Sequence, residues 1–381
     1  MPEILTLPCI PLSEPTLTPN AWTYVKDALD SGWVSSVGPY VERFEREFAR
    51  YFQVPRTAAT INGTAALHIA LLLANIQPGD EVIVPSLTFI ASINVIRYVG
   101  AIPVFWDSQP DHWNADPALL ESLITPKTKA ILVVHLYGDA MDMGPVLEVA
   151  RKYNLKVVED AAEALGASWR GQPCGTIGDV GCLSFNGNKV LTTGGGGLII
   201  SKEPDLIERA HYLINQAKND ALTFTHDEIG HNYRLTNMQA ALGVAQLENL
   251  PEFLEKRCQI WQRYQDAFTG HPLLINFGIT EDTIRSSWLY GLAINSDSLP
   301  SHRDAMTMVN QLKQRNIQSR PFFKPGHLQK PFQSFVHTPL PNAAHWHRLG
   351  FNLPSSCSLS KQYQDHVIES VLEILQAWNS E

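Results

Sequence analysis

Short apolar strands and amphipathic helices alternate over the first two thirds of the chain, and this alternation limits the possible folds more than any other feature. The predicted strands cover residues 57–61, 81–84, 102–106, 129–136 and 155–160, and the predicted helices cover 64–73, 91–99, 117–124 and 146–153. Strands separated by helices of this length form βαβ units. The pattern therefore predicts an α/β fold with a mostly parallel central sheet, in which ligands bind at the carboxyl ends of the strands. Those ends fall at Asn62, Pro85, His135 and Asp160.

The pattern changes near residue 240, where a second part of the chain is predicted to begin. A long helix is predicted at residues 237–254 and another at 256–267. Beyond them, a strand at 288–294 and helices at 305–315 and 363–378 indicate a smaller α+β unit. A chain of 381 residues is long for one domain, so we expect two. They are a large domain with an N-terminal arm, residues 1–245, and a small C-terminal domain, residues 246–381.

The charge balance and the spacing of cysteines and histidines argue against several classes of protein. Lysine and arginine total 29 against 38 aspartate and glutamate, so the net charge of −9 disfavours binding to nucleic acid or to an anionic membrane. The N-terminus has no signal-peptide pattern, and no apolar run reaches the ~18 residues that a membrane helix needs. The 5 cysteines lack CxxC spacing and the 13 histidines lack an HExxH cluster, so no metal site is expected. We expect a cytoplasmic enzyme.

Lys189 lies in a segment that suits a lysine held as a Schiff base. It ends the run Ser-Phe-Asn-Gly-Asn-Lys at residues 184–189, and four glycines follow at 194–197. A lysine amine in an enclosed site can attack a carbonyl, and a carboxylate at a strand end, here Asp160, can hold a pyridinium nitrogen protonated. These are the two protein groups that pyridoxal phosphate (PLP) chemistry needs most. Taken alone, Lys189 would be a solvated surface lysine, but the glycines allow backbone to approach a ligand closely.

Other side chains have both a cofactor-binding and a structural interpretation. Residues 62–67 place a glycine and the Thr64 hydroxyl at a helix start, which forms either an anion site for a cofactor phosphate or a simple N-cap. Ser184 could add a second hydroxyl or could cap a strand end. Phe89 could lie flat against the cofactor ring or belong to the core. Glu163 is either a second polar contact to the cofactor or a solvated glutamate.

Over nearly its whole length the chain resembles the DegT-type nucleotide-sugar aminotransferases of PLP-dependent fold type I. The matching segments are residues 32–38, 44–45, 62–67, 85–89, 159–162, 184–189 and 230–241. The resemblance implies that Lys189 carries the Schiff base, that Asp160 pairs with the pyridine nitrogen and that Phe89 stacks on the ring. It also implies three residues that hold the phosphate, namely Thr64, Ala65 and Ser184.

The resemblance further implies a homodimer with shared active sites. The asparagine of the family that matches Asn232 reaches the phosphate of the other subunit. The acceptor sugar carries a diphosphate, which needs cations despite the net acidity of the chain. The candidates are Arg234, Arg320 and Lys324.

Two departures from the common family pattern bear on the substrate. This chain has Gly195 where many members have glutamate, and Glu163 where many have glutamine or histidine. With residues 186–189, both resemble the C4-aminotransferases of the legionaminic acid and bacillosamine type. The resemblance implies transfer of the amino group of L-glutamate to C4 of a UDP-linked 4-keto-6-deoxy-N-acetylhexosamine. Perosamine enzymes share Gly-Asn-Lys, so a GDP-4-keto-6-deoxymannose 4-aminotransferase is an alternative, as is a C3 sugar aminotransferase.

Three further functions are compatible with parts of the sequence. Sugar 3-dehydratases resemble this family but carry histidine at the position of Lys189, so the lysine disfavours a dehydratase. A non-catalytic regulator on the same fold is disfavoured because no DNA-binding segment or basic patch is present. A nicotinamide oxidoreductase is disfavoured because the glycines at 194–197 do not join the first strand to the first helix.

Overall fold

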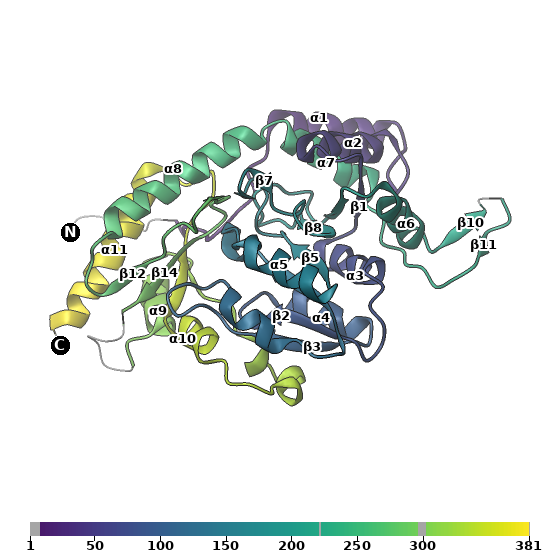
Figure 1. The fold of residues 1–381 in the computed structure, drawn as a ribbon. Helices are drawn as coiled ribbons and strands as arrows, with labels where there is room; N and C mark the ends of the chain where they lie inside the picture. The colour runs from purple at the N-terminus through teal and green to yellow at the C-terminus, as the bar shows by residue number, and fades with distance from the viewer. Residues whose placement is uncertain (1–7, 221, 296–301, 381) are drawn as a thin grey trace.

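The computed structural model describes residues 8–220, 222–295 and 302–380, and a seven-stranded sheet forms its centre (Figure 1). In spatial order the strands are β1 (Arg56–Thr60), β9 (Gly197–Ser201), β8 (Val180–Ser184), β5 (Lys156–Asp160), β4 (Thr128–Val134), β2 (Glu81–Pro85) and β3 (Ile102–Trp106). The strands from β8 to β3 pair in parallel, whereas β9 runs antiparallel to both β8 and β1. The prediction of an α/β fold with a mostly parallel central sheet is confirmed.

Helices cover this sheet. Its central strands are apolar on both faces, so both faces can be buried. The helices are α3 (Gly63–Leu73), α4 (Ile90–Tyr98), α5 (Met143–Tyr153), α6 (Pro204–Ile214), and the 3₁₀ helices η1 (Pro117–Leu123) and η2 (Leu136–Gly138). In β4, Ala130, Leu132 and Val134 belong to one buried cluster, whereas Ile131 and Val133 belong to a second cluster with α5. Successive side chains of a strand point to opposite faces, so β4 is buried on both sides, as is usual in α/β proteins.

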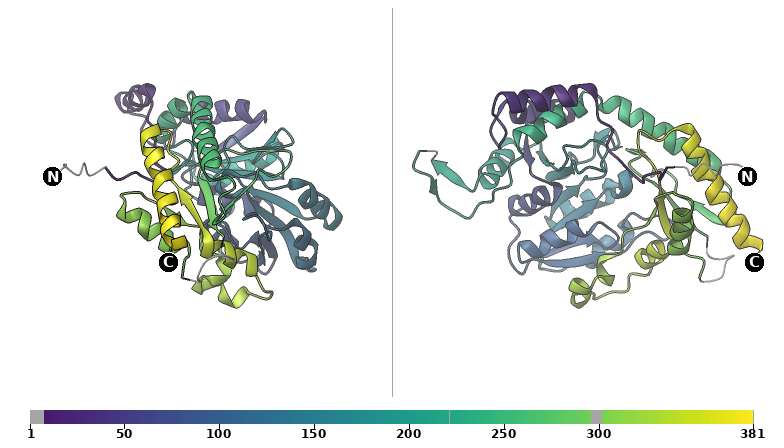
Figure 2. Two further views of the ribbon diagram at one scale, coloured as in Figure 1. Left: turned by 90° about the vertical axis from the view of Figure 1, so that its left-hand side faces the viewer. Right: turned by 180° about the vertical axis from the view of Figure 1, so that it is seen from behind.

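A second sheet follows the long helix α8 (Leu250–Phe268), which leads away from the seven-stranded sheet (Figure 2). It is antiparallel, with the strand order β12 (Leu274–Asn276), β14 (Tyr290–Ile294), β16 (Gly350–Leu353) and β15 (Arg320–Pro321). Its helices are α9 (Ala305–Gln314), α10 (Pro341–Leu349), α11 (Lys361–Ser380), η4 (Gly326–Leu328) and η5 (Lys330–Phe335). We propose that the two sheets mark the two domains, with the boundary near residue 245.

The N-terminal arm contacts both parts of the chain. Ile10 pairs in parallel with Ile317, and its backbone N–H donates to the Asn316 carbonyl at 2.8 Å, so the arm begins beside the second sheet. It then leads into α1 (Pro19–Asp30) and α2 (Pro39–Phe52), which pack on α7 (Asn237–Leu247). The arm therefore contacts the second sheet at its start and α7 further along the chain.

The structure differs from the predicted elements in three places. The break between the helices predicted at 237–254 and 256–267 lies earlier, between α7 and α8, because Pro251 lacks an N–H and its ring would clash with the carbonyl four residues earlier in a continuous helix. The segment predicted as a helix at 117–124 is the 3₁₀ helix η1. The strand predicted at 129–136 ends at Val134, before the turn η2.

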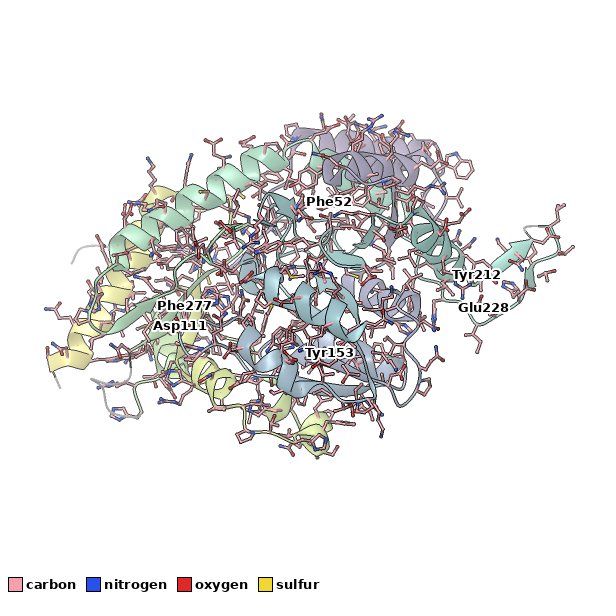
Figure 3. The ribbon with its side chains drawn as sticks, viewed as in Figure 1. Phe52, Asp111, Tyr153, Tyr212, Glu228 and Phe277 are labelled. Carbon is pink, nitrogen blue, oxygen red and sulfur yellow. The ribbon has the colours of Figure 1, made fainter. Side chains whose placement is uncertain are left out.

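A hairpin of β10 (Lys218–Asp220) and β11 (Thr225–His226) projects from the body of the molecule (Figure 1). Glu228 forms an ion pair with Arg209 of α6 and lies near Tyr212 at the base of the hairpin (Figure 3). A small three-stranded sheet contains β13 (Thr283–Ile284), β6 (Ser168–Trp169) and β7 (Gln172–Pro173). Within the described ranges, no helix is long and apolar enough to span a membrane.

Candidate active site

A cavity of about 400 Å³ lies at the carboxyl ends of the parallel strands β5 and β8. The residues predicted from the sequence that line it are Thr64, Phe89, Asp160, Glu163, Ser184, Lys189 and Arg320. The lining residues contributed by the second part of the chain are Trp288, Leu289, Arg320, Pro321, Phe323 and Asn352. The cavity thus lies between the two parts of the chain, at the sheet edge where a ligand site was predicted.

Four residues predicted for the site do not line this cavity, namely Ala65, Asn232, Arg234 and Lys324. The backbone N–H of Ala65 donates to Asn62 Oδ1 at 2.8 Å, inside the first turn of α3. Asn232 and Lys324 are exposed, and Arg234 forms an isolated bridge with Thr60. The structure of one chain therefore places these four residues outside its own cavity.

The Lys189 amine lies in the cavity against a carboxylate. Its Nζ is 3.2 Å from Glu163 Oε1, and only 13% of the lysine side chain is exposed. Glu163 is buried and accepts the backbone N–H of Tyr137 at 2.8 Å. Burial raises the pKa of Glu163, and the charge of Lys189 opposes this shift. Lys189 and Glu163 are therefore residues of the site, and neither is a solvated surface residue.

Asp160 forms part of the cavity wall as a buried carboxylate with two hydrogen-bond donors. The Ser92 hydroxyl donates to Oδ2 at 2.6 Å, and the backbone N–H of Ala162 donates to Oδ1 at 3.1 Å. Burial raises the pKa of Asp160, while these two bonds and the nearby Lys189 lower it. Asp160 is thus held in a fixed orientation in a site where a cationic partner would stabilise its charge.

The start of α3 meets the end of β8 at one end of the cavity. Gly63 and Thr64 are the first residues of α3, so their N–H groups have no partner within the helix. A Cβ on Gly63 would lie 2.8 Å from Ser184 Cβ, so glycine is needed for this close approach. The Asn62 side chain caps the helix. The N-cap and the anion site are therefore compatible, and this end of the cavity suits a phosphate group.

Phe89 is an exposed aromatic side chain at the cavity. It is 53% exposed, and its ring centroid lies 5.5 Å from that of Phe323. A core phenylalanine would be buried, so the interpretation of Phe89 as a core residue is wrong. An exposed ring in the cavity wall suits contact with a planar ligand.

His135 follows a strand end but belongs to the structural interior. Its Nε2 lies 2.9 Å from Glu159 Oε2, and both side chains are fully buried. Glu159 also accepts the backbone N–H groups of Gly175, Ile177 and Gly178. His135 is absent from the cavity wall, so this pair holds the loop at residues 175–178 and does not form part of the site.

Some residues that line or support the cavity have only a weak signal in the sequence. Ser92 is a polar residue in the apolar pattern of α4, and a search for such interruptions could have found it. Trp288, Phe323 and Asn352 follow Lys189 by about a hundred residues or more, and no local pattern connects them with it.

Comparisons with known proteins identify the family of the chain. The chain matches the DegT/DnrJ/EryC1/StrS aminotransferase family over residues 15–372. It is 41% identical over 376 residues to a GDP-perosamine synthase of Caulobacter vibrioides, covering 97% of this chain and 99% of that protein. It is 38% identical over 365 residues to a GDP-perosamine synthase of Escherichia coli O157:H7, covering 96% and 98%. The PLP form of the Streptococcus pneumoniae protein Spr1654 superposes with a TM-score of 0.91 at 30% identity, covering 97% and 99%.

The residues of the cavity fit the cofactor of this family. Enzymes of the family depend on PLP, which is a planar ring with a phosphate, an aldehyde and a ring nitrogen. The start of α3 with Ser184 offers an anion site, Lys189 an amine, Asp160 a buried carboxylate and Phe89 an exposed ring. The chain belongs to the DegT/DnrJ/EryC1/StrS aminotransferase family, and it is a PLP-dependent sugar aminotransferase.

Proposed function

We propose that this enzyme transfers the amino group of L-glutamate to C4 of a nucleotide-linked 4-keto-6-deoxy sugar. The observation that carries the proposal is the Lys189 amine, enclosed with two carboxylates and an anion site in one cavity. Two nucleotides, UDP and GDP, are candidates for the carrier of the sugar. The residues Gly195 and Glu163 favour a UDP-linked N-acetylhexosamine, and the similarity to two GDP-perosamine synthases gives GDP-4-keto-6-deoxymannose at least equal support.

We propose that some side chains of the cavity bind the cofactor and that others transfer protons. When bound, PLP supplies an electron sink for the substrate carbon that loses its proton. The Lys189 amine faces the cavity, and we propose that it takes up and returns this proton. We propose that Asp160 keeps the ring nitrogen positively charged and that Glu163 orients the amine. The residues proposed to bind the rest of the cofactor are Thr64, Ser184 and Phe89.

Arg320 is the candidate cation for the substrate. It is exposed, starts β15 and lines the cavity, whereas Arg234 and Lys324 do not line it. A guanidinium group binds phosphate oxygens through two parallel hydrogen bonds. We propose that Arg320 contacts the diphosphate of the sugar nucleotide.

A half-reaction assay with a panel of sugars tests the substrate. The pyridoxamine form of the enzyme is mixed with UDP-linked and GDP-linked 4-keto-6-deoxy sugars, and the recovery of visible absorbance is followed. We expect rapid recovery with one nucleotide series and, by NMR of the product, a new amine at C4. An amine at C3 would refute the proposed regiochemistry. A failure of both series would refute the sugar class.

We further propose that the functional unit is a homodimer in which Asn232 serves the partner's phosphate site. Asn232 is exposed and lies outside the cavity of its own chain. It closely follows the projecting hairpin, where Leu222 and Phe224 are 90% and 64% exposed, and the segment after β11, where Ile229 is 87% exposed. Apolar side chains at such exposure favour burial against another protein surface. At a two-fold interface each subunit lends the same residue to the other.

Mixed dimers test this sharing of residues. Asn232→Ala and Lys189→Ala homodimers should both be impaired. A mixed dimer has one site with both residues intact and one site with neither, so co-expression of the two variants should restore up to about half of the activity per mixed dimer. The activity of heterodimers purified by two different tags provides the measurement. A verified heterodimer without activity would place Asn232 in the site of its own subunit.

A further inference from the structure

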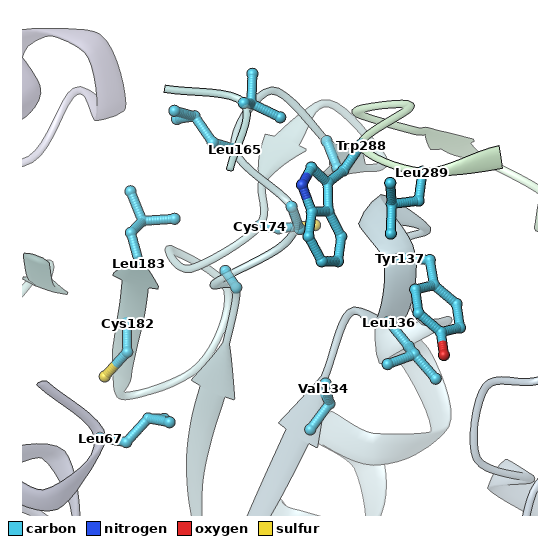
Figure 4. Close-up of a cluster of buried hydrophobic side chains, with 14 of the residues drawn as sticks. Leu67, Val134, Leu136, Tyr137, Leu165, Cys174, Cys182, Leu183, Trp288 and Leu289 are labelled. Carbon is cyan, nitrogen blue, oxygen red and sulfur yellow. The ribbon is translucent and has the colours of Figure 1, made fainter. Parts of the chain in front are cut away.

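Tyr137 lies behind the cavity wall and has a backbone conformation that is rare for tyrosine. It belongs to the turn η2 after β4, and its φ of 56° falls in the left-handed region. This conformation is strained for a residue with a Cβ and persists only where the surrounding contacts impose it. The residue is 2% exposed. Figure 4 shows its ring among buried side chains that include Leu136 from the same turn and Trp288 and Leu289 from the second part of the chain.

The backbone of this turn supports the part of the cavity wall that contains Glu163. The Tyr137 N–H donates to Glu163 Oε2 at 2.8 Å, and Oε1 of the same carboxylate lies 3.2 Å from the Lys189 amine. The next residue, Gly138, also has a left-handed φ, of 89°, and its carbonyl accepts the Ser286 N–H at 2.8 Å. The Ser286 hydroxyl donates to the Glu163 carbonyl at 2.9 Å. The turn therefore fixes Glu163 through both its side chain and its backbone.

The phenol of Tyr137 supports another part of the wall. Its oxygen accepts the backbone N–H of Phe323 at 2.8 Å, although the two residues are 186 positions apart. Phe323 follows β15, whose residues Arg320 and Pro321 also line the cavity. The Tyr137 ring packs on the rings of Phe322 and Phe323, with centroids 4.9 Å and 5.2 Å away. Burial raises the pKa of Tyr137 well above its ordinary value, so the phenol stays uncharged.

We propose that Tyr137 is a positioning residue for the sugar half-reaction, and that its phenol oxygen holds residues 320–323 in the conformation that binds the sugar nucleotide. The inference rests on the proposed function, in which Arg320 contacts the diphosphate. A partly buried N–H that loses its acceptor is unfavourable, so without the phenol oxygen the Phe323 backbone would move to regain a partner. That movement would displace Arg320 and Phe323 from the places where the substrate needs them.

Tyr137→Phe separates the two contacts of this residue. The substitution removes the phenol oxygen and keeps the ring and the backbone N–H that donates to Glu163. The reaction with L-glutamate depends on Lys189, Asp160 and Glu163, whose contacts are unchanged in the variant. The reaction with the keto sugar depends in addition on residues 320–323. We therefore expect the variant to be impaired in the sugar half-reaction alone.

Tyr264 supplies a matched control. It is a fully buried tyrosine of α8, and its hydroxyl donates to the Pro354 carbonyl at 2.9 Å. It does not line the cavity. Tyr264→Phe therefore also removes a buried phenol oxygen that makes a hydrogen bond to the backbone of the second part of the chain, but at a place outside the substrate site.

The test follows the pyridoxamine form of each enzyme with increasing concentrations of the keto sugar that the wild type accepts. In Tyr137→Phe, the concentration that gives the half-maximal rate should rise about tenfold. The maximal rate and the glutamate half-reaction should stay within about twofold of the wild type. Tyr264→Phe should match the wild type in all three measurements. An unchanged half-maximal concentration in Tyr137→Phe would overturn the proposal, and so would an equal slowing of both half-reactions.

Hydrogen exchange at residues 321–325 gives a second readout that needs no substrate. Prolines at 321 and 325 carry no N–H, so the exchanging backbone groups of this segment belong to Phe322, Phe323 and Lys324. The Phe322 N–H donates to the Gly350 carbonyl at 2.8 Å and serves as the internal reference. Exchange at Phe323 should become about tenfold faster in Tyr137→Phe, with Phe322 unchanged. Equal exchange at Phe323 in the variant and the wild type would overturn the proposal.

Thermal unfolding of each variant identifies any loss of fold. Exchange in the wild type alone keeps the proposal testable in that case, because a Phe323 amide that exchanges as fast as an exposed peptide would overturn it. A wild-type enzyme that aminates no keto sugar of either nucleotide series would refute the proposed function. Faster exchange at Phe323 in Tyr137→Phe, with an unchanged glutamate half-reaction, would then still support the positioning of residues 320–323 by Tyr137.

Discussion

Lys189→Ala is expected to abolish transamination and to leave the fold intact. Lys189 provides the single lysine amine among the described residues that line the cavity, so no neighbour can replace it. We expect turnover to fall by at least about 10⁴-fold, as for the loss of a covalent catalyst. The fold should survive because Glu163, left without its partner, already has a raised pKa and would take up a proton.

Steady-state amine transfer measured without added amines tests this expectation. Lys189→Arg is the matched variant, because it keeps a positive charge beside Glu163 but cannot form a covalent bond to the cofactor. Both variants should retain PLP by its phosphate, and equilibrium dialysis measures this binding. Turnover of Lys189→Ala at more than a trace level would remove Lys189 from the mechanism.

Asp160→Asn is expected to slow the glutamate half-reaction far more than it weakens cofactor binding. The substitution keeps the volume of the side chain, and an amide can still accept the Ala162 N–H and bond to Ser92. It removes the negative charge that we propose holds the ring nitrogen protonated. Loss of such electrostatic stabilisation costs about 10²–10³-fold in rate.

Stopped-flow absorbance with L-glutamate measures this rate, and titration of the cofactor measures affinity. Glu163→Gln is the variant for comparison, since it neutralises the other buried carboxylate of the cavity, 3.2 Å from the Lys189 amine, which we do not propose to contact the ring nitrogen. A wild-type rate in Asp160→Asn would show that Asp160 is only a structural carboxylate at the end of β5.

The strands and the sheet edge that carries the site could be predicted from the sequence because they depend on local patterns. The strands β1, β2, β3 and β5 lie within about a residue of their predicted bounds, since apolar runs flanked by turn residues have few alternatives in an α/β fold. The break before Pro251 was missed, although proline disfavours a continuous helix there.

The part of the cavity wall that comes from the second part of the chain could not be predicted from the sequence. Trp288 and Asn352 join the same cavity as Lys189 only after the chain has folded, and such long-range contacts leave no periodic signal. The sequence also left the roles of Phe89 and Glu163 open, because an aromatic or acidic residue has the same local pattern in a core, on a surface or in a site. The exposure of Phe89 excludes a core position, and the burial of Glu163 excludes a solvated position.

The most direct test of the central claim is the response of the purified enzyme to L-glutamate. If Lys189 holds PLP as proposed, the purified enzyme should absorb visible light, and we expect an excess of glutamate to bleach this band while one equivalent of 2-oxoglutarate is released per subunit. A nucleotide-linked 4-keto sugar should then restore the band and yield the amino sugar. An enzyme whose visible band persists in glutamate, or which forms no 2-oxoglutarate, would contradict the assignment of Lys189 and its cavity as an aminotransferase site.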